Sequence, residues 1–458
     1  MCHTLNSKCR KDRLMKIPRY IFIAVAIVAI INTCFDVARS NRLRNDDKPL
    51  SLDDYKSKIE SNPLMPKVDS MAKAVVATGF SAGSGYGEVW IRDYNTFIEL
   101  SMDVLDDELI RRNLDVFFAF QEESGEVMDG FIDIKKADLS YDYRFSKNAP
   151  EYAAHKNTVE TDQESSLVQA VYKYVTKSGN KSYLQNELFG LKVIDRLEAA
   201  MNFLLNEKTA KEYGLITGAT TADWGDVQPE HFWGVAIDEN THYTIDIYDN
   251  AMFVIALNNL IELCDNAEKK AHWTKVRDEL KQNIKKYLWD AENQKFIPHI
   301  YLNGSPFPAS FDESKIFYHG GTGVAVMAGL LNHNEIVNSN NKMLENMRKA
   351  HAQSIGLTLY PTYPHGYFKN TMMYPYGYQN GGDWTWFGAR MIMGLIDNGF
   401  IAEAYNELQP MLARVVENNG FYEWYTPAGE PMGSGTYRGE AGVLYKCNQM
   451  LREWAASN

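Results

Sequence analysis

Apolar residues recur at helical spacing along most of the chain from residue 52 onward, and this pattern restricts the fold more than any other feature. The candidate helices are of two kinds. Residues 248–264 are mostly apolar, whereas residues 269–288 mix apolar side chains with Lys, Arg and Glu. A mostly apolar helix is buried on all sides, and an amphipathic helix is solvated on one face. Because the two kinds alternate along the chain, we expect two concentric rings of helices, with the inner ring buried.

The helical pattern predicts ten helices and little strand. The helices are residues 108–121, 164–176, 190–205, 248–264, 269–288, 323–331, 338–352, 383–397, 401–416 and 440–454. Five segments rich in Gly, Tyr and Trp stand out beside them, namely residues 79–95, 214–231, 307–322, 356–384 and 420–438. They are longer than helix connections require, and long loops of this composition usually build a binding site. Residues 46–458 contain no Pro/Ser-rich linker, so a single domain is predicted.

The first 45 residues have the layout of a targeting signal. Six Lys and Arg residues within residues 1–19 precede an apolar run at residues 21–31. This is the order found in secretory signals, and the run is shorter than the ~20 residues that span a bilayer comfortably. We therefore expect an exported protein, in the periplasm, on the cell surface or secreted. Residues 1–45 would be a signal peptide or, through residues 20–35 or a lipid on Cys34, an N-terminal membrane anchor.

The composition narrows the class of partner. Acidic residues (59) outnumber Lys and Arg (47), and the resulting net charge of −12 argues against a nucleic-acid binder, which needs a basic face. Aromatic residues make up 12% of the chain. Most of these rings belong to the core, but rings of this kind also stack on the faces of sugars. A carbohydrate is therefore the expected partner, and contact with a membrane is expected only through the N-terminal segment.

Cysteine and histidine give no indication of a metal. Beyond the first 45 residues the chain has two cysteines, Cys264 and Cys447, each within an apolar helical pattern. A free cysteine in such a position packs as a small hydrophobe. The ten histidines are scattered, and no Cys/His cluster has the spacing of zinc ligands. The sequence predicts neither a metal site nor a cofactor.

The first clusters of polar residues come before predicted helices. Arg92 and Asp93 follow Trp90. An aspartate accepts hydrogen bonds from sugar hydroxyls, an arginine donates them, and an indole ring supplies an apolar platform. A structural salt bridge at the start of a helix is the alternative explanation. Asp162 and Glu164 precede an apolar helix, where an N-cap explains Asp162 equally well.

Two further clusters place carboxylates among aromatic residues. Asp223 and Asp226 flank Trp224 in a loop of small residues, where apolar surroundings can raise the pKa of a carboxyl group into the range of a general acid. An Asx turn is the alternative explanation for this pair. Glu423 lies among aromatic residues that include Trp424. A buried glutamate in such a nest is costly unless it has a partner or a catalytic task.

A fifth cluster combines amides, a carboxylate and indoles at the start of a predicted helix. It contains Gln379, Asn380, Asp383 and Trp384. Asp383 by itself could cap the helix, but the glycines and tryptophans around it favour a wall of a binding site.

Carboxylates on separate loops, with aromatic and Arg/Asp groups around them, suit the transfer of a glycosyl group to water. One carboxyl protonates the leaving oxygen while the other activates water or attacks the sugar. Two other chemistries fit less well. Residues 83–85 are Gly-Ser-Gly and do not form the G-x-S-x-G turn of a serine hydrolase, and residues 83–87 lack the βαβ context of a dinucleotide loop.

The order of these motifs resembles that of the (α/α)6-barrel glycoside hydrolases. The similarity is greatest to the glycogen-debranching and processing α-glucosidases, with glucoamylases, trehalases and neutral invertases more distant. The motifs are W-I-R-D (90–93), D-Q-E (162–164), D-W-G-D (223–226), Y-Q-N-G-G-D-W (378–384) and Y-E-W-Y (422–425). The resemblance runs from about residue 79 to the C-terminus. It implies an all-α (α/α)6 toroid of six helical hairpins, with long loops forming the site at one end.

The resemblance also implies roles for individual residues. Arg92 and Asp93 would bind the terminal sugar, Asp226 in a Trp-x-Asp element would be the general acid, and Glu423 would be the general base. Three departures matter. The debranching pattern has an apolar or hydroxyl residue in place of Asp223, so the choice of acid between Asp223 and Asp226 stays open. Asp383 replaces a less acidic residue, and the accessory β-domain of many relatives is not apparent.

The resulting hypothesis is that the protein is an exported glycoside hydrolase. It would cleave a glycosidic bond of an oligosaccharide that is an α-glucoside, by an inverting acid/base mechanism. The substrate-binding residues would be Trp90, Arg92, Asp93, Trp224, Gln379, Asn380, Asp383, Trp384 and Trp424. One alternative is an (α/α)6 sugar epimerase or polysaccharide lyase, which would use His or Tyr as proton carrier and make His319 or His365 central. Another is a carbohydrate-binding surface protein without catalysis, which would not need the paired acids.

Overall fold

The computed structural model describes residues 50–137, 142–156, 159–232 and 235–458. The predicted signal segment, residues 1–45, lies outside these ranges, as do the apolar run at residues 21–31, the anchor at residues 20–35 and Cys34. None of the helices in the described residues is long and apolar enough to cross a membrane. Residues Tyr55–Asn458 form one compact unit.

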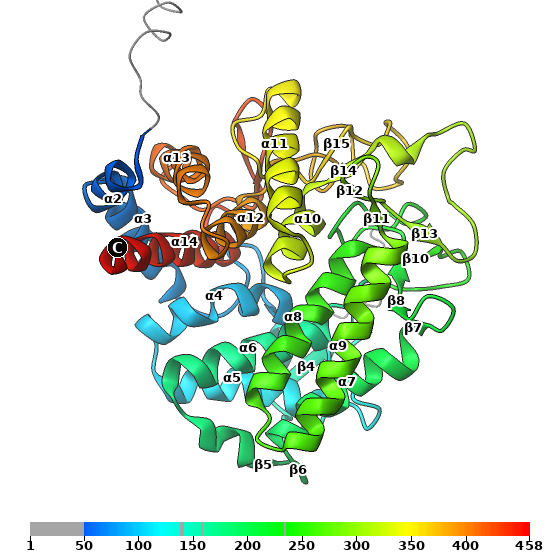
Figure 1. Ribbon diagram of the computed structural model, residues 1–458. Helices are drawn as coiled ribbons and strands as arrows, with labels where there is room; N and C mark the ends of the chain where they lie inside the picture. The colour runs from blue at the N-terminus through cyan, green and yellow to red at the C-terminus, as the bar shows by residue number, and fades with distance from the viewer. Residues whose placement is uncertain (1–49, 138–141, 157–158, 233–234) are drawn as a thin grey trace, which may run out of the picture. The chain divides into compact units, whose positions relative to one another are not determined.

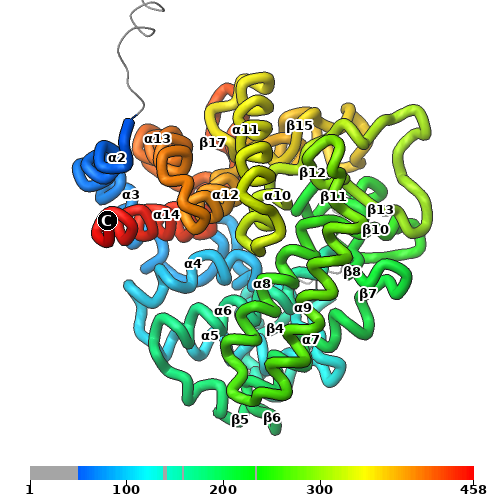
Figure 2. The backbone as a smooth tube through the Cα atoms, viewed as in Figure 1, coloured from blue at the N-terminus to red at the C-terminus, as the bar shows by residue number. Residues whose placement is uncertain are grey.

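Six helices of this unit form a closed inner ring. They are α4 (Ile91–Val104), α6 (Gln163–Ser178), α8 (Ile247–Leu263), α10 (His319–Met327), α12 (Thr385–Asp397) and α14 (Arg438–Ser457). Each packs against the next, and α14 packs against α4, which closes the ring. Figure 2 shows this closure as the red C-terminal helix lying beside the blue α3 and the lighter blue α4.

Six further helices alternate with the inner ones along the chain (Figure 1). They are α3 (Leu64–Val76), α5 (Asp107–Phe120), α7 (Val193–Glu207), α9 (Ala267–Tyr287), α11 (His333–Ala350) and α13 (Ile401–Glu417), and α2 (Leu52–Glu60) precedes them. Each outer helix leads into the following inner helix, so the unit consists of six helical hairpins. The predicted all-α (α/α)6 toroid is confirmed.

Burial explains why two kinds of helix alternate in the sequence. Every residue of α12 from Thr385 to Ile396 is buried, so an apolar composition is required on all sides. In the 21 residues of α9 only Trp273, Leu280 and Ile284 are buried, and the rest of its surface tolerates Lys, Arg and Glu. The two free cysteines of the described residues are both buried. The predicted inner and outer rings therefore follow from which helix faces are shielded from water.

Most predicted helices lie within a few residues of their observed bounds, but two differences affect the site. Helix α4 begins at Ile91, inside the predicted loop 79–95, so Arg92 and Asp93 lie in its first turn. Helix α10 begins at His319 instead of residue 323. Its first turn contains Gly320 and Gly321, which are poor helix formers. Their N–H groups donate to the carboxylate of Asp223, 97 and 98 positions away, so a tertiary contact completes this turn.

The strands of the described residues are short and antiparallel. A four-stranded sheet has the order β1 (Val89–Trp90), β2 (Gly130–Asp133), β4 (Tyr152–His155), β3 (Arg144–Phe145), and a three-stranded sheet has the order β13 (Ile300–Tyr301), β10 (Tyr243–Ile245), β9 (Gly218–Ala219). The pairs are β5 (Glu187–Leu188) with β6 (Leu191–Lys192), β7 (Thr209–Ala210) with β8 (Leu215–Ile216), β11 (Trp289–Asp290) with β12 (Lys295–Phe296), β14 (Phe317–Tyr318) with β15 (Leu359–Tyr360), and β16 (Trp424–Tyr425) with β17 (Pro431–Met432). Short 3-10 helices are η1 (Ile134–Lys136), η2 (Lys181–Gln185) and η3 (Glu313–Lys315).

Several of these strands hold the loops at the N-terminal ends of the inner helices. Strand β1 ends directly before α4, β14 ends directly before α10, and β10 ends two residues before α8 begins. In the four-stranded sheet Trp90 pairs with Gly130, and Gly130 pairs with His155. Residues far apart in the chain are thereby brought to one end of the ring.

Candidate active site

A cavity of about 640 Å³ lies at the N-terminal ends of the inner helices, within the ~300–1,000 Å³ range of small-molecule sites. Eight of the predicted site residues line it: Trp90, Arg92, Asp93, Trp224, Asp226, Gln379, Trp384 and Glu423. Residues from four of the five predicted loops contribute, and the segment at residues 307–322 does not. The fold thus gathers carboxylates, one arginine and several indoles around one space.

Asp226 is fixed in this wall by a single amide side chain. Gln379 Nε2 donates to Asp226 Oδ1 at 2.6 Å, and the backbone N–H of Asp226 donates to Gln379 Oε1 at 3.1 Å. The two bonds bind the aspartate at both its backbone and its side chain. The Asp226 side chain is half-buried and lines the cavity, so it can meet a substrate with a defined orientation.

Glu423 is more deeply buried, with 6% of its surface exposed. Burial raises the pKa of its carboxyl group, and the charge of Asp226 raises the pKa further, whereas a hydrogen bond from Tyr86 lowers it. Gly433 adopts a φ of +73°, and a Cβ atom there would lie 2.0 Å from Glu423 Oε2. Only glycine at position 433 therefore leaves room for this carboxylate.

Asp93 supplies a third carboxyl group to the cavity. Burial raises its pKa to about 7, while Arg92 and a hydrogen bond from Tyr437 act in the opposite direction. The charges of Glu423 and Asp226 also raise the pKa of Asp93, which places the three carboxyl groups close enough to influence one another. Neighbouring carboxyl groups of which two, Asp93 and Glu423, have a raised pKa are typical of an active site.

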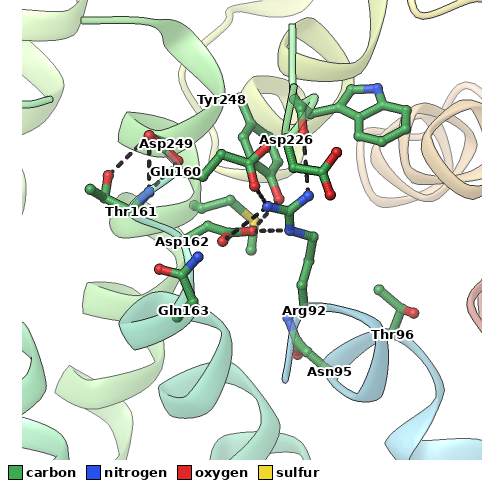
Figure 3. Close-up of polar contacts among 12 residues, drawn as sticks. Arg92, Asn95, Thr96, Glu160, Thr161, Asp162, Gln163, Asp226, Tyr248 and Asp249 are labelled. Atoms are coloured by element: carbon green, nitrogen blue, oxygen red, sulfur yellow. Dashed lines mark hydrogen bonds and ion pairs between the residues drawn. The ribbon is translucent and has the colours of Figure 1, made fainter. Parts of the chain in front are cut away.

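Arg92 is a buried cation held by acidic residues behind the cavity wall (Figure 3). Its Nε lies 2.7 Å from Asp162 Oδ2, its Nη2 pairs with Glu160, and Tyr248 donates to Asp162 at 2.6 Å. Burial lowers the pKa of Arg92, but Asp162 and its other neighbours hold the pKa well above its usual value. Figure 3 shows the Asp226 carboxylate near the same guanidinium group. Arg92 is therefore a fixed positive charge beside the proposed acid.

Aromatic rings supply the apolar part of the wall. The ring of Trp90 meets that of His155 edge to face at 4.6 Å. Trp224 meets Trp384 edge to face at 4.8 Å and stacks on Phe387 at 4.0 Å. Indole rings locked in this way present rigid apolar faces at low entropic cost, which suits the apolar faces of a sugar ring.

Asp223 lies outside the cavity wall, although Trp224 beside it lines the cavity. It is 1% exposed, and its two carboxylate oxygens accept the N–H groups of Gly320 and Gly321 at 2.7 and 2.8 Å. Its backbone has a φ of +60°, which turns the chain sharply between the two aspartates. Both carboxylate oxygens of Asp223 thus serve the start of α10, which leaves Asp226 as the cavity-facing carboxylate of this loop.

Three other predicted residues also lie behind the wall. Asp383 forms a buried ion pair with Arg414, with N–O distances of 2.9 and 3.0 Å, and accepts two hydrogen bonds from Ser354. Asn380 bonds the backbone of Tyr363 through both ends of its amide. Trp424 is buried, and its ring meets that of Tyr378 edge to face. These residues support the loops that carry Gln379, Trp384 and Glu423.

Several residues of the wall have no counterpart in the motifs. Tyr86, Asp129, His155, Trp386 and Tyr437 all line the cavity. Burial raises the pKa of Asp129 to about 8 and lowers the pKa of His155 to about 4. Both residues are placed by the four-stranded sheet, because the backbone of Asp129 bonds that of His155 and Ile91. Asp129 and His155 lie outside the predicted loops, so the sequence pattern does not point to them. Tyr86 and Tyr437 lie within predicted loops.

The two histidines singled out for an epimerase or lyase do not line the cavity. His319 is buried at the start of α10, bonded to Ile355 O and to Asn346, and burial lowers its pKa to about 4. His365 lies on an exposed loop. Neither is placed to move a proton on a molecule in the cavity.

Comparison with known proteins agrees with this geometry. The model of the glycosyl hydrolase 94 superfamily, catalytic domain, matches residues 67–436, which contain every residue of the cavity wall except Tyr437. The chain belongs to this superfamily. The resemblance to (α/α)6 glycoside hydrolases is thereby confirmed. No match was found among curated proteins.

Solved glycosidase structures share the fold. The GH63 mannosylglycerate hydrolase from Thermus thermophilus, in complex with glucose, has a TM-score of 0.60 and 17% identity, over 84% of this chain and 100% of that one. A rhamnosidase from Klebsiella oxytoca with rhamnose bound has a TM-score of 0.56 and 13% identity, over 85% and 64%. The GH78 rhamnosidase of Bacillus sp. GL1 has a TM-score of 0.57 and 14% identity, over 84% and 34%.

These findings establish the class of enzyme. Similarity at such low identity shows the fold, and the superfamily match shows that the protein is a glycoside hydrolase. The epimerase, lyase and non-catalytic alternatives are therefore set aside. The substrate is a glycoside or oligosaccharide, in keeping with the carbohydrate partner expected from the sequence.

Proposed function

We propose that the protein hydrolyses an α-glucoside with inversion of configuration, with Asp226 as the general acid and Glu423 as the general base. One observation carries the proposal: Asp226 and Glu423 face the same cavity from different loops, each held by a partner of its own. Gln379 holds Asp226 and Tyr86 holds Glu423. Two separately anchored carboxyl groups suit a mechanism in which a water molecule stands between the sugar and the base.

The proposed reaction is a single displacement at the anomeric carbon. Asp226 gives its proton to the glycosidic oxygen as the bond to the anomeric carbon breaks. Glu423 takes a proton from a water molecule, whose oxygen forms the new bond on the opposite face of the ring. The two carboxyl groups exchange protonation state and return to the starting state through solvent. Burial raises the pKa of Glu423, so this carboxyl group must be ionised before it can act as the base, and its carboxylate then binds the proton of water more strongly.

The remaining wall residues would bind the sugar. Asp93 would accept hydrogen bonds from hydroxyl groups, and Trp90 and Trp384 would contact the faces of the ring. Arg92 already pairs with Asp162 and Glu160, so its role is to fix the charge beside Asp226 rather than to close on the substrate. The α-glucoside preference rests on the sequence resemblance to α-glucosidases and on the glucose complex of the Thermus thermophilus enzyme.

The proposal predicts the configuration of the first product. Hydrolysis of an aryl α-glucoside, followed by proton NMR within the first minutes, is expected to show β-glucose before mutarotation produces the α-anomer. A parallel panel of aryl α- and β-glycosides tests the sugar. Release of α-glucose first would contradict inversion, and turnover confined to glycosides other than α-glucosides would contradict the substrate while leaving the acid/base pair intact.

We also propose that the protein is exported. The support is the basic segment of residues 1–19 followed by the apolar run at residues 21–31. Fractionation of the source cell, with N-terminal sequencing of the mature protein, is expected to find the chain outside the cytoplasm, either cleaved near residue 45 or held at a membrane. Recovery of uncleaved chain in the cytoplasmic fraction alone would contradict export.

A further inference from the structure

A second cavity, of about 330 Å³, lies inside the ring of inner helices. All six inner helices contribute to its wall: Asn95 of α4, Lys173 of α6, Met252 of α8, Met327 of α10, Arg390 of α12 and Lys446 of α14 are examples. Helices α4 and α12 contribute residues to both cavities. In each of these helices, the residues that line the second cavity come later in the sequence than those that line the active-site cavity. We call the second cavity the lower cavity.

Arg390 is a buried cation in the lower cavity that has no counter-ion among the described residues. It is 4% exposed and forms no ion pair with any carboxylate of the described residues. Its Nη1 lies 3.9 Å from the sulfur of Met252, and its Nη2 is buried with no hydrogen-bond partner among these residues. A buried guanidinium group with an unused N–H donor is costly, because water has been removed and no acceptor replaces it.

Lys173 adds a second positive charge to the same wall. Its Nζ donates to the backbone oxygen of Asn95 at 2.6 Å and to the side-chain oxygen at 2.9 Å, so both acceptors are neutral. Burial lowers the pKa of Lys173 to about 8, Glu99 raises it, and repulsion by Arg390 lowers it further. The two cations therefore repel each other across the cavity wall, and an anion between them would relieve this repulsion.

Among the acidic residues around the lower cavity, Glu99 acts on Lys173, but none of the described carboxylates forms an ion pair with Arg390. Glu99 pairs with Lys446 at 2.8 Å, and that pairing is at the edge of the cavity, where both side chains are partly exposed. Asp397 and Glu453 are exposed at the rim. Arg390, the buried charged group of this wall, thus has no ion pair among the described residues, and Lys173 bonds neutral oxygens, in a protein whose net charge is −12. A protein with an overall negative charge repels anions, so an anion binds here only if fixed positive groups attract it.

We propose that the lower cavity binds a small organic carboxylate, with its carboxylate group on Arg390 and Lys173. The planar fork of a guanidinium group matches a carboxylate, and a charge-assisted bond would satisfy the unused Nη2 donor. The apolar part of the ligand would lie against methionines of the wall, including Met252, Met327 and Met393. Thioether side chains adapt to ligands of different shape, and the cavity volume suits a molecule of a few carbon atoms.

A ligand bound in the lower cavity would affect the active site through the aromatic side chains that contact Arg390. Arg390 lies over Phe387 at 4.3 Å and over Trp386 at 5.1 Å. Trp386 lines the active-site cavity, and Phe387 stacks on Trp224, which also lines it. A carboxylate that holds Arg390 would therefore stiffen the aromatic wall on which the sugar is expected to lie.

Thermal unfolding of the full chain tests the proposal. Sodium butyrate or sodium acetate would replace sodium chloride at constant ionic strength, with sodium phosphate as a separate arm. A ligand that binds only the folded state raises Tm by mass action, and we expect a saturable rise of roughly 1–3 °C, reached at lower concentration with butyrate than with acetate. The longer chain of butyrate buries more apolar surface, which accounts for that order.

Matched variants locate the effect. Arg390→Met should abolish the saturable rise, whereas Arg348→Met, which makes the same change of charge on the exposed surface of α11, should retain it. Glu423→Gln should also retain it, because its side chain lines the other cavity. If Arg390→Met does not fold, Lys173→Met takes its place and should weaken butyrate binding at least tenfold.

Three results would overturn the proposal. The first is the absence of a saturable rise in the wild-type protein, or an equal rise in Arg390→Met and Arg348→Met. The second is a rise with phosphate and none with either carboxylate, which would assign a different ligand class. The third is loss of the rise in Glu423→Gln, which would place the bound anion in the active-site cavity.

Discussion

Replacement of Glu423 by Gln is expected to lower kcat by about 10²- to 10⁴-fold while the fold is retained. Glutamine keeps the volume and can still accept the hydrogen bond from Tyr86, but it has no basic carboxylate to take a proton from water. The measurement is steady-state hydrolysis of an α-glucoside, with circular dichroism and Tm as checks on folding. Because the position is buried, a loss of activity with an unchanged Tm separates chemistry from stability.

Glu430→Gln is the matched control for this variant. Glu430 lies in the same segment but is exposed and does not line the cavity, so its kcat should stay close to wild type. The pH profile gives a second check: kcat/KM should fall as the pH drops through the raised pKa of Glu423, at a pH above the ordinary range of a glutamate. Retention of more than about a tenth of wild-type activity in Glu423→Gln would rule out the base assignment.

The fold could be predicted from the sequence because the inner and outer helices differ in how much of each helix is buried, and this difference determines their composition. In α12 every residue from Thr385 to Ile396 is buried, and in α9 three residues are, so the two helices differ visibly in composition. The sequence pattern predicts the start of α10 four residues late, because the helical turn at Gly320 and Gly321 is completed by their contact with Asp223. The local sequence pattern cannot reveal a contact with a residue 97 positions away.

The site could be predicted in part, for a related reason. The sequence identifies the polar residues of the Gly- and Trp-rich loops, but it does not reveal which way each side chain points. Asp223 and Asp226 are three residues apart, yet one caps a helix and the other lines the cavity, a difference set by a backbone turn with φ of +60°. Asp129 and His155 carried no signal, because only strand pairing brings them beside Trp90.

Asp226→Asn is expected to lower kcat on a natural disaccharide by about 10²- to 10⁴-fold, with a much smaller loss on an activated aryl glucoside. A sugar leaving group must be protonated as the bond breaks, whereas a nitrophenolate leaves without a proton. Asparagine at position 226 can keep the hydrogen bond from Gln379 to its oxygen, so the loop should remain in place. The measurement is the ratio of kcat/KM for the two substrates, compared with the wild-type ratio.

Asp223→Asn should behave in the opposite way and serves as the comparison. The buried carboxylate of Asp223 accepts one hydrogen bond from each of two backbone N–H groups. The amide of an asparagine has one oxygen that can accept one of these bonds, but its NH₂ group would face the other N–H, which is also a donor. Leaving a buried donor unsatisfied costs about 1–3 kcal/mol, so this variant should lose stability in urea unfolding and keep the wild-type ratio of the two substrates. If instead Asp223→Asn alone spared the aryl glucoside, the proton would have to come from position 223, and the acid assignment to Asp226 would fail.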